Sequence, residues 1–255
     1  MVVAARTASR ERQRARDWAE IQERMLVPLY EAVYRRLDVG PATSVLGLGC
    51  GSGLALLLAA ARGAPVAGLE TDRELSTLAR GRELRVLPGP EGTGEVGRYG
   101  LVTAFDGLAC AADPEVVVKE AADATLPGGH VVLAAWGPPE RCDSAAVLGV
   151  ARRLGPGRSP DPFALSAPGA LEGLAQQAGL RLVGGGRINC PFAYPDLDSA
   201  VRGLLSTGFF DAAAERAGED AVSGELAAAL SAFRGESGAV RMTNVFRYVL
   251  AESVR

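Results

Sequence analysis

The sequence of 255 residues contains a single histidine, His130, and a single lysine, Lys119. Catalytic schemes that need several histidines, and metal sites rich in histidine, are therefore excluded. The four cysteines lie far apart, and no pair has the spacing of metal ligands. We therefore expect no metal site, and thiols that remain unpaired.

Long apolar runs and a basic character are also absent. The longest apolar candidate, residues 54–61, is far shorter than the roughly 18 residues of a membrane-spanning helix. The first 20 residues alternate arginines with acids and lack the apolar stretch of a signal peptide. The net charge of −3 gives no basic surface for nucleic acid. We expect a cytoplasmic protein with no nucleic-acid or membrane partner.

What is present is a succession of short helices and strands. Residues 11–38 have one amphipathic helical face, which Pro28 should kink or divide. Strands are predicted at 44–49, 65–70, 84–87, 101–105 and 130–136, with helices at 54–62, 73–80 and 114–124. Strands that alternate with helices indicate parallel βαβ units.

The second half of the sequence is less regular. A helix is predicted at 170–178 and a strand at 181–189, in which Gly184, Gly185 and Gly186 suggest a bulge. Alanine-rich segments at 198–206 and 211–233 are predicted as helices, and 243–251 as a final strand. Stretches rich in glycine and proline at 88–100 and 155–162 predict loops.

Alternating glycines follow the first predicted strand, at Gly47, Gly49, Gly51 and Gly53. Glycines let a backbone approach a ligand closely, and the helix that follows presents free N–H groups. Glu70 closes the next strand, where doubly wound folds place an acid that holds ribose hydroxyls. The loop therefore binds a nucleoside or is only a tight turn. Its spacing does not fit the G-x-G-x-x-G pattern of dinucleotide sites.

This glycine pattern resembles the first motif of class I S-adenosylmethionine (SAM)-dependent methyltransferases. The resemblance covers nearly the whole chain, in segments 17–18, 30–33, 46–53, 66–70, 111–114, 126–129, 136–137, 163–166, 194–198 and 246–248. It points to the small-molecule branch, similar to quinone-biosynthesis methyltransferases. The resemblance implies an α/β, doubly wound fold. Its seven-stranded sheet is mostly parallel with an antiparallel last strand, and it carries an N-terminal helical segment and a small helical cap.

The resemblance also implies the organisation of the chain and its cofactor site. We expect one domain over 1–255, with N-terminal helices at 1–40, a nucleoside-binding half at 41–137 and a helical cap inserted at 190–240. The cofactor is expected to be SAM, and the residues that would bind it are Gly47, Gly49, Gly51, Gly53, Glu70, Thr71 and Phe105.

Three acids of the family pattern are replaced in this sequence. The acid that usually contacts the methionine portion of SAM is Gly47 here, and the acid that takes the adenine amino group is Pro88. A third, before strand four, is Gly100. Each lost charged hydrogen bond weakens binding by about 1.5–3 kcal/mol. The replacements favour either a methyltransferase that tolerates them or a scaffold recruited for other chemistry.

The side chains nearest to the chemistry follow from the rule that ligands bind beyond the carboxyl ends of parallel strands. Asp106 follows the fourth strand and is the candidate general base, unless it only caps the next turn. His130 begins its strand and is expected to be structural, at the opposite edge. Four aromatic side chains can wall an acceptor pocket, although core packing is their alternative role: Trp18, Tyr30, Tyr34 and Trp136.

The function predicted from these features is SAM-dependent methylation of a small, partly apolar metabolite in secondary metabolism. One alternative is SAM-independent natural-product chemistry on the same fold, by cyclisation, condensation or elimination. Another is a non-catalytic partner subunit, and a homodimer or a partner enzyme is left open. Glu70 discriminates between these interpretations, because it either holds a ribose at a solvent-filled crevice or caps the helix that begins near Arg73.

Overall fold

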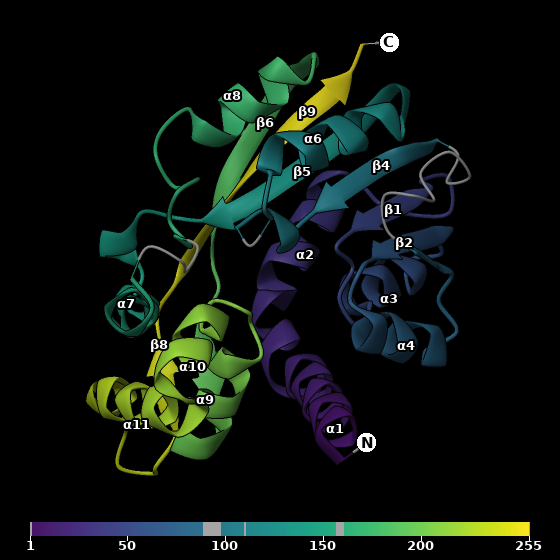
Figure 1. Cartoon of the computed structure of the whole chain (residues 1–255). Coiled ribbons are helices and arrows are strands. Elements are labelled where there is room, and N and C mark those ends of the chain that lie inside the picture. The colour runs from purple at the N-terminus through teal and green to yellow at the C-terminus, as the bar shows by residue number, and fades with distance from the viewer. Residues whose placement is uncertain (1, 89–97, 110, 157–160, 255) are drawn as a thin grey trace.

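The structure is a computed structural model that describes residues 2–88, 98–109, 111–156 and 161–254. Parts of the predicted loops at 88–100 and 155–162, and Cys110, lie outside these residues. In the described chain, seven strands form one twisted sheet in the order β3-β2-β1-β4-β5-β9-β6 (Figure 1). The strands are β1 (Val45–Leu48), β2 (Val66–Glu70), β3 (Val86–Pro88), β4 (Tyr99–Ala104), β5 (Thr125–Trp136), β6 (Leu180–Asn189) and β9 (Val245–Ser253).

The direction of the strands confirms the predicted fold class. Strands β1 to β5 pair in parallel, whereas β9 pairs antiparallel with both β5 and β6. The register of β6 on β9 shifts between Leu182 and Gly184, which confirms the predicted bulge. The sheet is therefore the mostly parallel, seven-stranded arrangement with an antiparallel last strand, and that strand lies inside the sheet next to the edge strand β6.

Helices cover both faces of the sheet because neighbouring strand residues point to opposite sides. On one side lie α2 (Val27–Arg36), α3 (Leu54–Ala60) and α4 (Arg73–Gly81); on the other lie α6 (Pro114–Asp123) and α8 (Ala170–Gln177). Val45 and Leu101 belong to the first core, and the adjacent Leu46 and Val102 to the second. All four side chains are at most 1% exposed, so both layers are well packed.

Aspartates set the start of several helices. Asp72 accepts hydrogen bonds from the backbone N–H of Glu74 at 2.8 Å and of Leu75 at 2.9 Å, at the N-terminus of α4. Asp113 caps α6 in the same way, and Asp196 caps α9 (Leu197–Leu205). Such caps satisfy N–H groups that have no partner within the helix. The predicted starts of these three helices lie within one residue of the observed ones, whereas the N-terminal helix, predicted from residue 11, begins at Val2.

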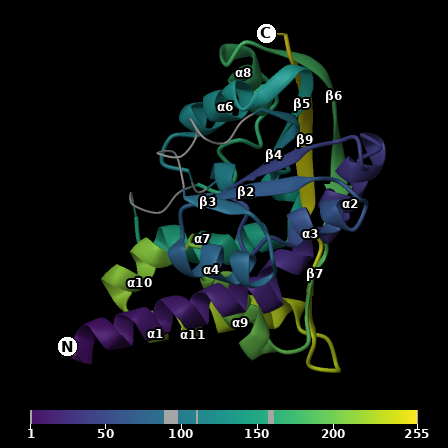
Figure 2. The same ribbon diagram turned by 90° about the vertical axis from the view of Figure 1, so that its right-hand side faces the viewer.

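The N-terminal segment and four further helices lie beyond the carboxyl ends of the parallel strands. Helix α1 (Val2–Asp17) continues through a π-helical stretch, Trp18–Gln22, and a 3-10 turn, Glu23–Leu26, into α2. Figure 2 shows α1 passing along α4 toward the helices that we call the cap helices: α9 (Leu197–Leu205), α10 (Asp211–Ala217) and α11 (Glu219–Leu230). Helix α7 (Ser144–Leu154) packs against α10 and α11.

Several elements differ from the sequence prediction. Helix α7 and the two-stranded ribbon of β7 (Phe192–Tyr194) and β8 (Val240–Met242) were not predicted. The predicted helix at 211–233 is divided at Gly218, which has a φ of 87°. The break in the N-terminal helix lies before Pro28, at 18–26, and Pro28 occupies the first turn of α2, where proline is tolerated. No helix of the described part is long and apolar enough to span a membrane.

Candidate functional site

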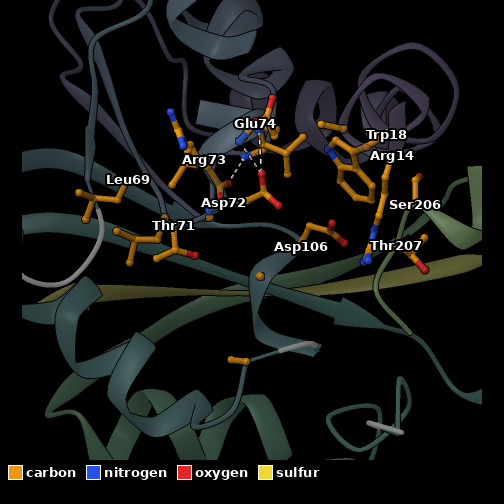
Figure 3. Close-up of a pocket in the computed structure, with 18 of the residues that line it drawn as sticks. Arg14, Trp18, Leu69, Thr71, Asp72, Arg73, Glu74, Asp106, Ser206 and Thr207 are labelled. Carbon is orange, nitrogen blue, oxygen red and sulfur yellow. Dashed lines mark hydrogen bonds between the residues drawn. The ribbon is translucent and has the colours of Figure 1, made fainter. Parts of the chain in front are cut away.

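A large cavity opens at the carboxyl ends of β1, β2 and β4, where parallel sheets bind ligands. Its volume is about 1130 Å³. The floor is formed by the strand ends and the glycine loop, and the sides by α1, α4, α6 and the loop that follows α9. Figure 3 labels several of the lining residues, among them Trp18, Asp72, Asp106 and Thr207.

Glu70 lies at the strand-end floor of the large cavity and holds the glycine loop in place. Its carboxylate accepts hydrogen bonds from the backbone N–H of Gly51 at 2.7 Å and of Asp72 at 2.9 Å. Burial raises the pKa of Glu70 above its usual value, while these two backbone N–H groups oppose the shift. The side chain is 8% exposed, so it is buried against the loop and does not stand in an open crevice. Because Asp72 caps α4, the helix-cap role proposed for Glu70 belongs to its neighbour.

Asp106 follows β4 and lines the same cavity on the side of α1 (Figure 3). Burial, followed by the negative charges of Glu23 and Glu70, raises the pKa of Asp106 to about 7. A carboxyl group with a pKa near neutral pH is suited to exchange a proton with a bound molecule. The position agrees with the predicted edge of the sheet, and its chemistry is compatible with a general base.

Trp18 lies in the π-helical stretch and faces the glycine loop. Its indole Nε1 is buried and has no hydrogen-bond partner among the described residues. A Cβ built on Gly51 would lie 2.9 Å from this nitrogen and 3.0 Å from Oε1 of Glu23. Gly51 therefore leaves open a space that borders on one donor and one acceptor, and any side chain there would fill it.

Glu23 is a residue of the site that the sequence interpretation missed. It is 2% exposed, and its carboxylate accepts hydrogen bonds from the Ser52 hydroxyl and, at 3.2 Å, from the backbone N–H of Leu54. Arg82 lies 3.7 Å from it. Burial raises the pKa of Glu23, opposed chiefly by the Ser52 hydrogen bond. The sequence did contain a sign of this role, because Glu23 lies on the same apolar helical face as Leu26 and Tyr30, where an acid is unusual.

A second, small chamber lies behind the glycine loop. Its volume is about 20 Å³, just above what one water molecule needs. Five residues line both the chamber and the large cavity, so the two adjoin: Trp18, Leu48, Gly49, Gly51 and Asp106. The remaining wall of the chamber includes Glu23, Tyr30, Gly47, Thr103 and Phe105.

The predicted site residues divide into three groups in the structure. Trp18, Gly49, Gly51, Glu70, Thr71 and Asp106 line the large cavity, as the described residues define it. Tyr30, Gly47 and Phe105 line the small chamber. Gly53, Tyr34 and Trp136 line neither. Gly53 precedes α3 with a φ of 90°, and the Tyr34 hydroxyl donates to the carbonyl of Ala55 at 3.0 Å.

Trp136 belongs to an aromatic cluster in the core, on the cap side of the sheet. Its ring centroid lies 4.5 Å from that of Phe246, 5.5 Å from that of Phe192 and 5.6 Å from that of Phe163. The side chain is 5% exposed. These surroundings therefore favour core packing, the alternative to a pocket wall, as the role of Trp136.

The replaced family acids have local structural consequences. A Cβ at Gly47 would lie 3.2 Å from Leu56 and 3.3 Å from Cys50, so these side chains occupy the space that an acid would need. Pro88 pairs with Glu70 in the register of β3 on β2. The backbone N–H of Gly100 donates to the Ser44 hydroxyl at 3.0 Å. Glycine at 47 thus allows tight packing of α3 on β1.

Comparison with protein families identifies the class of this fold and site. The model of the family described as "Methyltransferase domain" matches residues 10–184, which include the glycine loop, Glu70 and Asp106. The chain therefore belongs to this methyltransferase family. A search of curated proteins finds no match, and the quinone-biosynthesis branch stays a prediction.

Solved structures of the same fold are similar to the chain at low sequence identity. The YcgJ protein of Bacillus subtilis has a TM-score of 0.60 at 15% identity, covering 89% of this chain and 98% of its own. A putative methyltransferase of Bacillus halodurans has a TM-score of 0.58 at 14% identity, covering 89% and 99%. The 4+2 cyclase SpnF has a TM-score of 0.53 at 16% identity, covering 88% and 79%. These similarities establish the fold.

Proposed function

We propose that the protein is a SAM-dependent methyltransferase that acts on a small, partly apolar metabolite. The observation that carries this proposal is Glu70, which ends β2 in the floor of the large cavity and is bonded to Gly51. A carboxylate there can accept hydrogen bonds from ribose hydroxyls. The backbone at Gly49 and Gly51, both with a φ of 59°, leaves room for close approach of a ligand.

The size and charge of the large cavity fit SAM and a second molecule. Pockets for one small ligand usually measure about 300–1,000 Å³, and this cavity reaches about 1130 Å³. Eight acidic side chains and three arginines stand among its described lining residues. An excess of negative charge favours a cationic ligand, and SAM carries both a sulfonium and an ammonium group.

Asp106 is the proposed general base. When bound, SAM supplies an activated methyl group, so alignment of the acceptor can provide most of the rate. A base is needed only where the attacking atom carries a proton to lose. Asp106, with a pKa of about 7, takes up such a proton on the side of the cavity that Trp18, Arg14 and Thr207 enclose (Figure 3). The acceptor is placed there, between α1 and α9.

Isothermal titration with S-adenosylhomocysteine tests the proposal directly. We expect one site per chain with a dissociation constant well below about one millimolar. If the titration shows no heat of binding up to that concentration, the proposal is wrong, provided that a cooperative melting transition demonstrates that the protein is folded.

A second candidate is SAM-independent chemistry on the same fold. The packing of Leu56 and Cys50 against Gly47 favours it, because the family acid at this position would have to displace these side chains. The cyclase among the similar structures supports only the capacity of the fold for other reactions. Stoichiometric release of S-adenosylhomocysteine during turnover would exclude this candidate. The partner-subunit alternative lacks support, since the large hydrophobic side chains exposed in the described residues are Val116, Leu126 and Val254, away from the cap helices.

A further inference from the structure

The small chamber combines features that a passive packing defect lacks. Its wall includes the carboxylates of Glu23 and Asp106 and the hydroxyl-bearing Tyr30, all from different elements. Genuinely empty cavities in proteins are lined by apolar groups, whereas a chamber of this size that has acidic side chains in its otherwise largely apolar wall can hold a water molecule or a group of similar size. An ammonium group has that size.

The rim of the chamber offers a matched donor and acceptor. Trp18 Nε1 is a buried donor without a described partner, on a side chain that is 9% exposed. Oε1 of Glu23 borders on the same open space above Gly51. A carboxylate can accept about four hydrogen bonds, and Glu23 receives them from the hydroxyl and backbone of Ser52 and from the backbone of Leu54. Both groups therefore have capacity for a ligand.

We propose that Glu23 and Trp18 form the subsite for the amino-acid end of SAM, with Glu23 facing its ammonium group in the chamber and Trp18 Nε1 donating to its carboxylate. This inference rests on the proposed function. The N-terminal segment thereby provides the acid that β1 lacks at Gly47. The carboxylate comes from the N-terminal segment and lines the same chamber as Gly47, where Leu56 and Cys50 pack closely.

The geometry explains why the acid remains in place without a ligand. Arg82 donates to the Ser52 hydroxyl at 2.7 Å and to the Ser52 carbonyl at 2.9 Å, and lies 3.7 Å from Glu23. The Ser52 hydroxyl in turn donates to Glu23. This chain of contacts orients the carboxylate before a ligand arrives, which reduces the ordering that binding requires.

The test compares two probes by isothermal titration. S-adenosylhomocysteine carries the amino-acid end, and methylthioadenosine lacks it while keeping the nucleoside. Glu23→Gln and Trp18→Phe should each weaken the binding of S-adenosylhomocysteine by about tenfold or more. That factor is what the loss of one charge-assisted hydrogen bond usually causes. Affinity for methylthioadenosine should change less than about twofold. Glu31→Gln is the matched control, because Glu31 lies on the same N-terminal segment but pairs with Arg62 at 2.5 Å, outside both cavities.

The possible outcomes separate this inference from the proposed function. If the variants bind both probes more weakly by the same factor, the proposed subsite is wrong, since Glu23 would then only support the glycine loop. Unchanged affinity for S-adenosylhomocysteine would also overturn it, leaving a chamber for water alone. If wild-type protein binds both probes equally tightly, the proposed function survives and the subsite is wrong. If it binds neither, both proposals fail together.

Discussion

The two ends of the large cavity are built by different means. At the end proposed to bind the nucleoside, called the nucleoside end, Glu70 and the glycine loop are fixed by backbone hydrogen bonds and by the ends of parallel strands. At the end proposed to bind the acceptor, called the acceptor end, α1 meets the cap helices through side-chain ion pairs: Arg10 with Glu219, Arg14 with Asp211 at 2.8 Å, and Arg202 with Asp17 at 2.5 Å. The fold itself determines the first end, whereas the second depends on particular surface side chains.

This difference teaches where specificity can change. A site made from strand ends keeps its geometry as long as the sheet forms, so it suits a ligand common to many relatives. A site closed by helices that meet partly through exposed ion pairs, here Arg10–Glu219 and Arg14–Asp211, is less constrained, because such pairs contribute little stability. The acceptor end can therefore vary without loss of the nucleoside end.

The largest effect is expected from opening the aromatic cluster around Trp136, on the side of the sheet where the acceptor end lies. Trp136→Ala should lower the free energy of unfolding by about 3–5 kcal/mol, because it leaves a cavity among Phe163, Phe192 and Phe246. Chemical denaturation measures this loss. Val116→Ala is the control: this side chain is 50% exposed, and surface changes usually stay within about 0.5 kcal/mol. A loss below about 1 kcal/mol for Trp136→Ala would show that the aromatic cluster contributes little to stability.

Asp106→Asn tests the chemistry at the acceptor end. If Asp106 is the general base, kcat/KM for the methylated acceptor should fall by about a hundredfold or more. In wild-type protein the rate should rise with pH to a plateau above about 7, because only the ionised form accepts a proton. Affinity for methylthioadenosine, which lacks the amino-acid end, should be nearly unchanged. A variant with full activity would reassign Asp106 to a structural role.

Glu70→Gln sharpens the comparison at the other end. Affinity for S-adenosylhomocysteine should weaken by about 1.5–3 kcal/mol, since one charge-assisted acceptor of the ribose is lost. Stability should also fall, because Glu70 accepts from Gly51 and Asp72. Asp196→Ala separates the two effects: it removes the cap of α9 and about 0.5–2 kcal/mol of stability without touching the ribose site. If both variants lose stability and neither loses affinity, Glu70 does not hold the ribose.

The pH dependence of stability gives a smaller effect. The pKa of Asp106 is raised in the folded protein from 3.8 to about 7, so the folded state binds a proton more tightly than the unfolded state. Its contribution is fully present below about pH 4 and is lost as the pH rises toward 7, with a slope well below the roughly 1.4 kcal/mol per pH unit of a fully buried group, because the side chain is partly exposed to solvent. Asp106→Asn should flatten this slope in denaturation curves recorded across the window. If the variant shows the same slope, other titratable groups cause the pH dependence of stability.

The smallest effect is expected where α1 meets α11. Arg10→Gln removes an ion pair whose side chains are 62% and 44% exposed, and such pairs contribute about 0.2–1 kcal/mol. Trypsin cleavage within α1, followed by mass spectrometry, should become faster, and high salt should have the same effect on wild-type protein. Binding of methylthioadenosine should not respond. If neither Arg10→Gln nor high salt changes the rate of cleavage, apolar contacts alone hold α1 in place.

The nucleoside end could be predicted from the sequence because its signals are local. Strand alternation, the glycines and the acid that closes β2 all lie within about 25 residues, and each has a direct backbone reason. The caps at Asp72 and Asp113 are equally local. Periodicity and turn chemistry report on such short-range features, and the predicted sheet was confirmed for that reason.

The acceptor end could not be predicted in the same way. The π-helical stretch at Trp18–Gln22 rotates Trp18 and Glu23 relative to a regular helix, and no local pattern announces that rotation. Helix α7 was missed, and Tyr34 and Trp136 were offered as pocket walls although they pack in the core. Distinguishing an aromatic wall from an aromatic core requires the tertiary arrangement, because both use the same residues.

The position of β9 has a consequence for how the chain matures during translation. Strand β6 has no neighbour in the main sheet except β9, which lies between it and β5. While the ribosome is still making residues 245–253, β6 has no strand to pair with, and the free side of β5 stays exposed. A pause or a truncation before that point would leave two unpaired strand edges, which are the surfaces that chaperones and aggregation compete for.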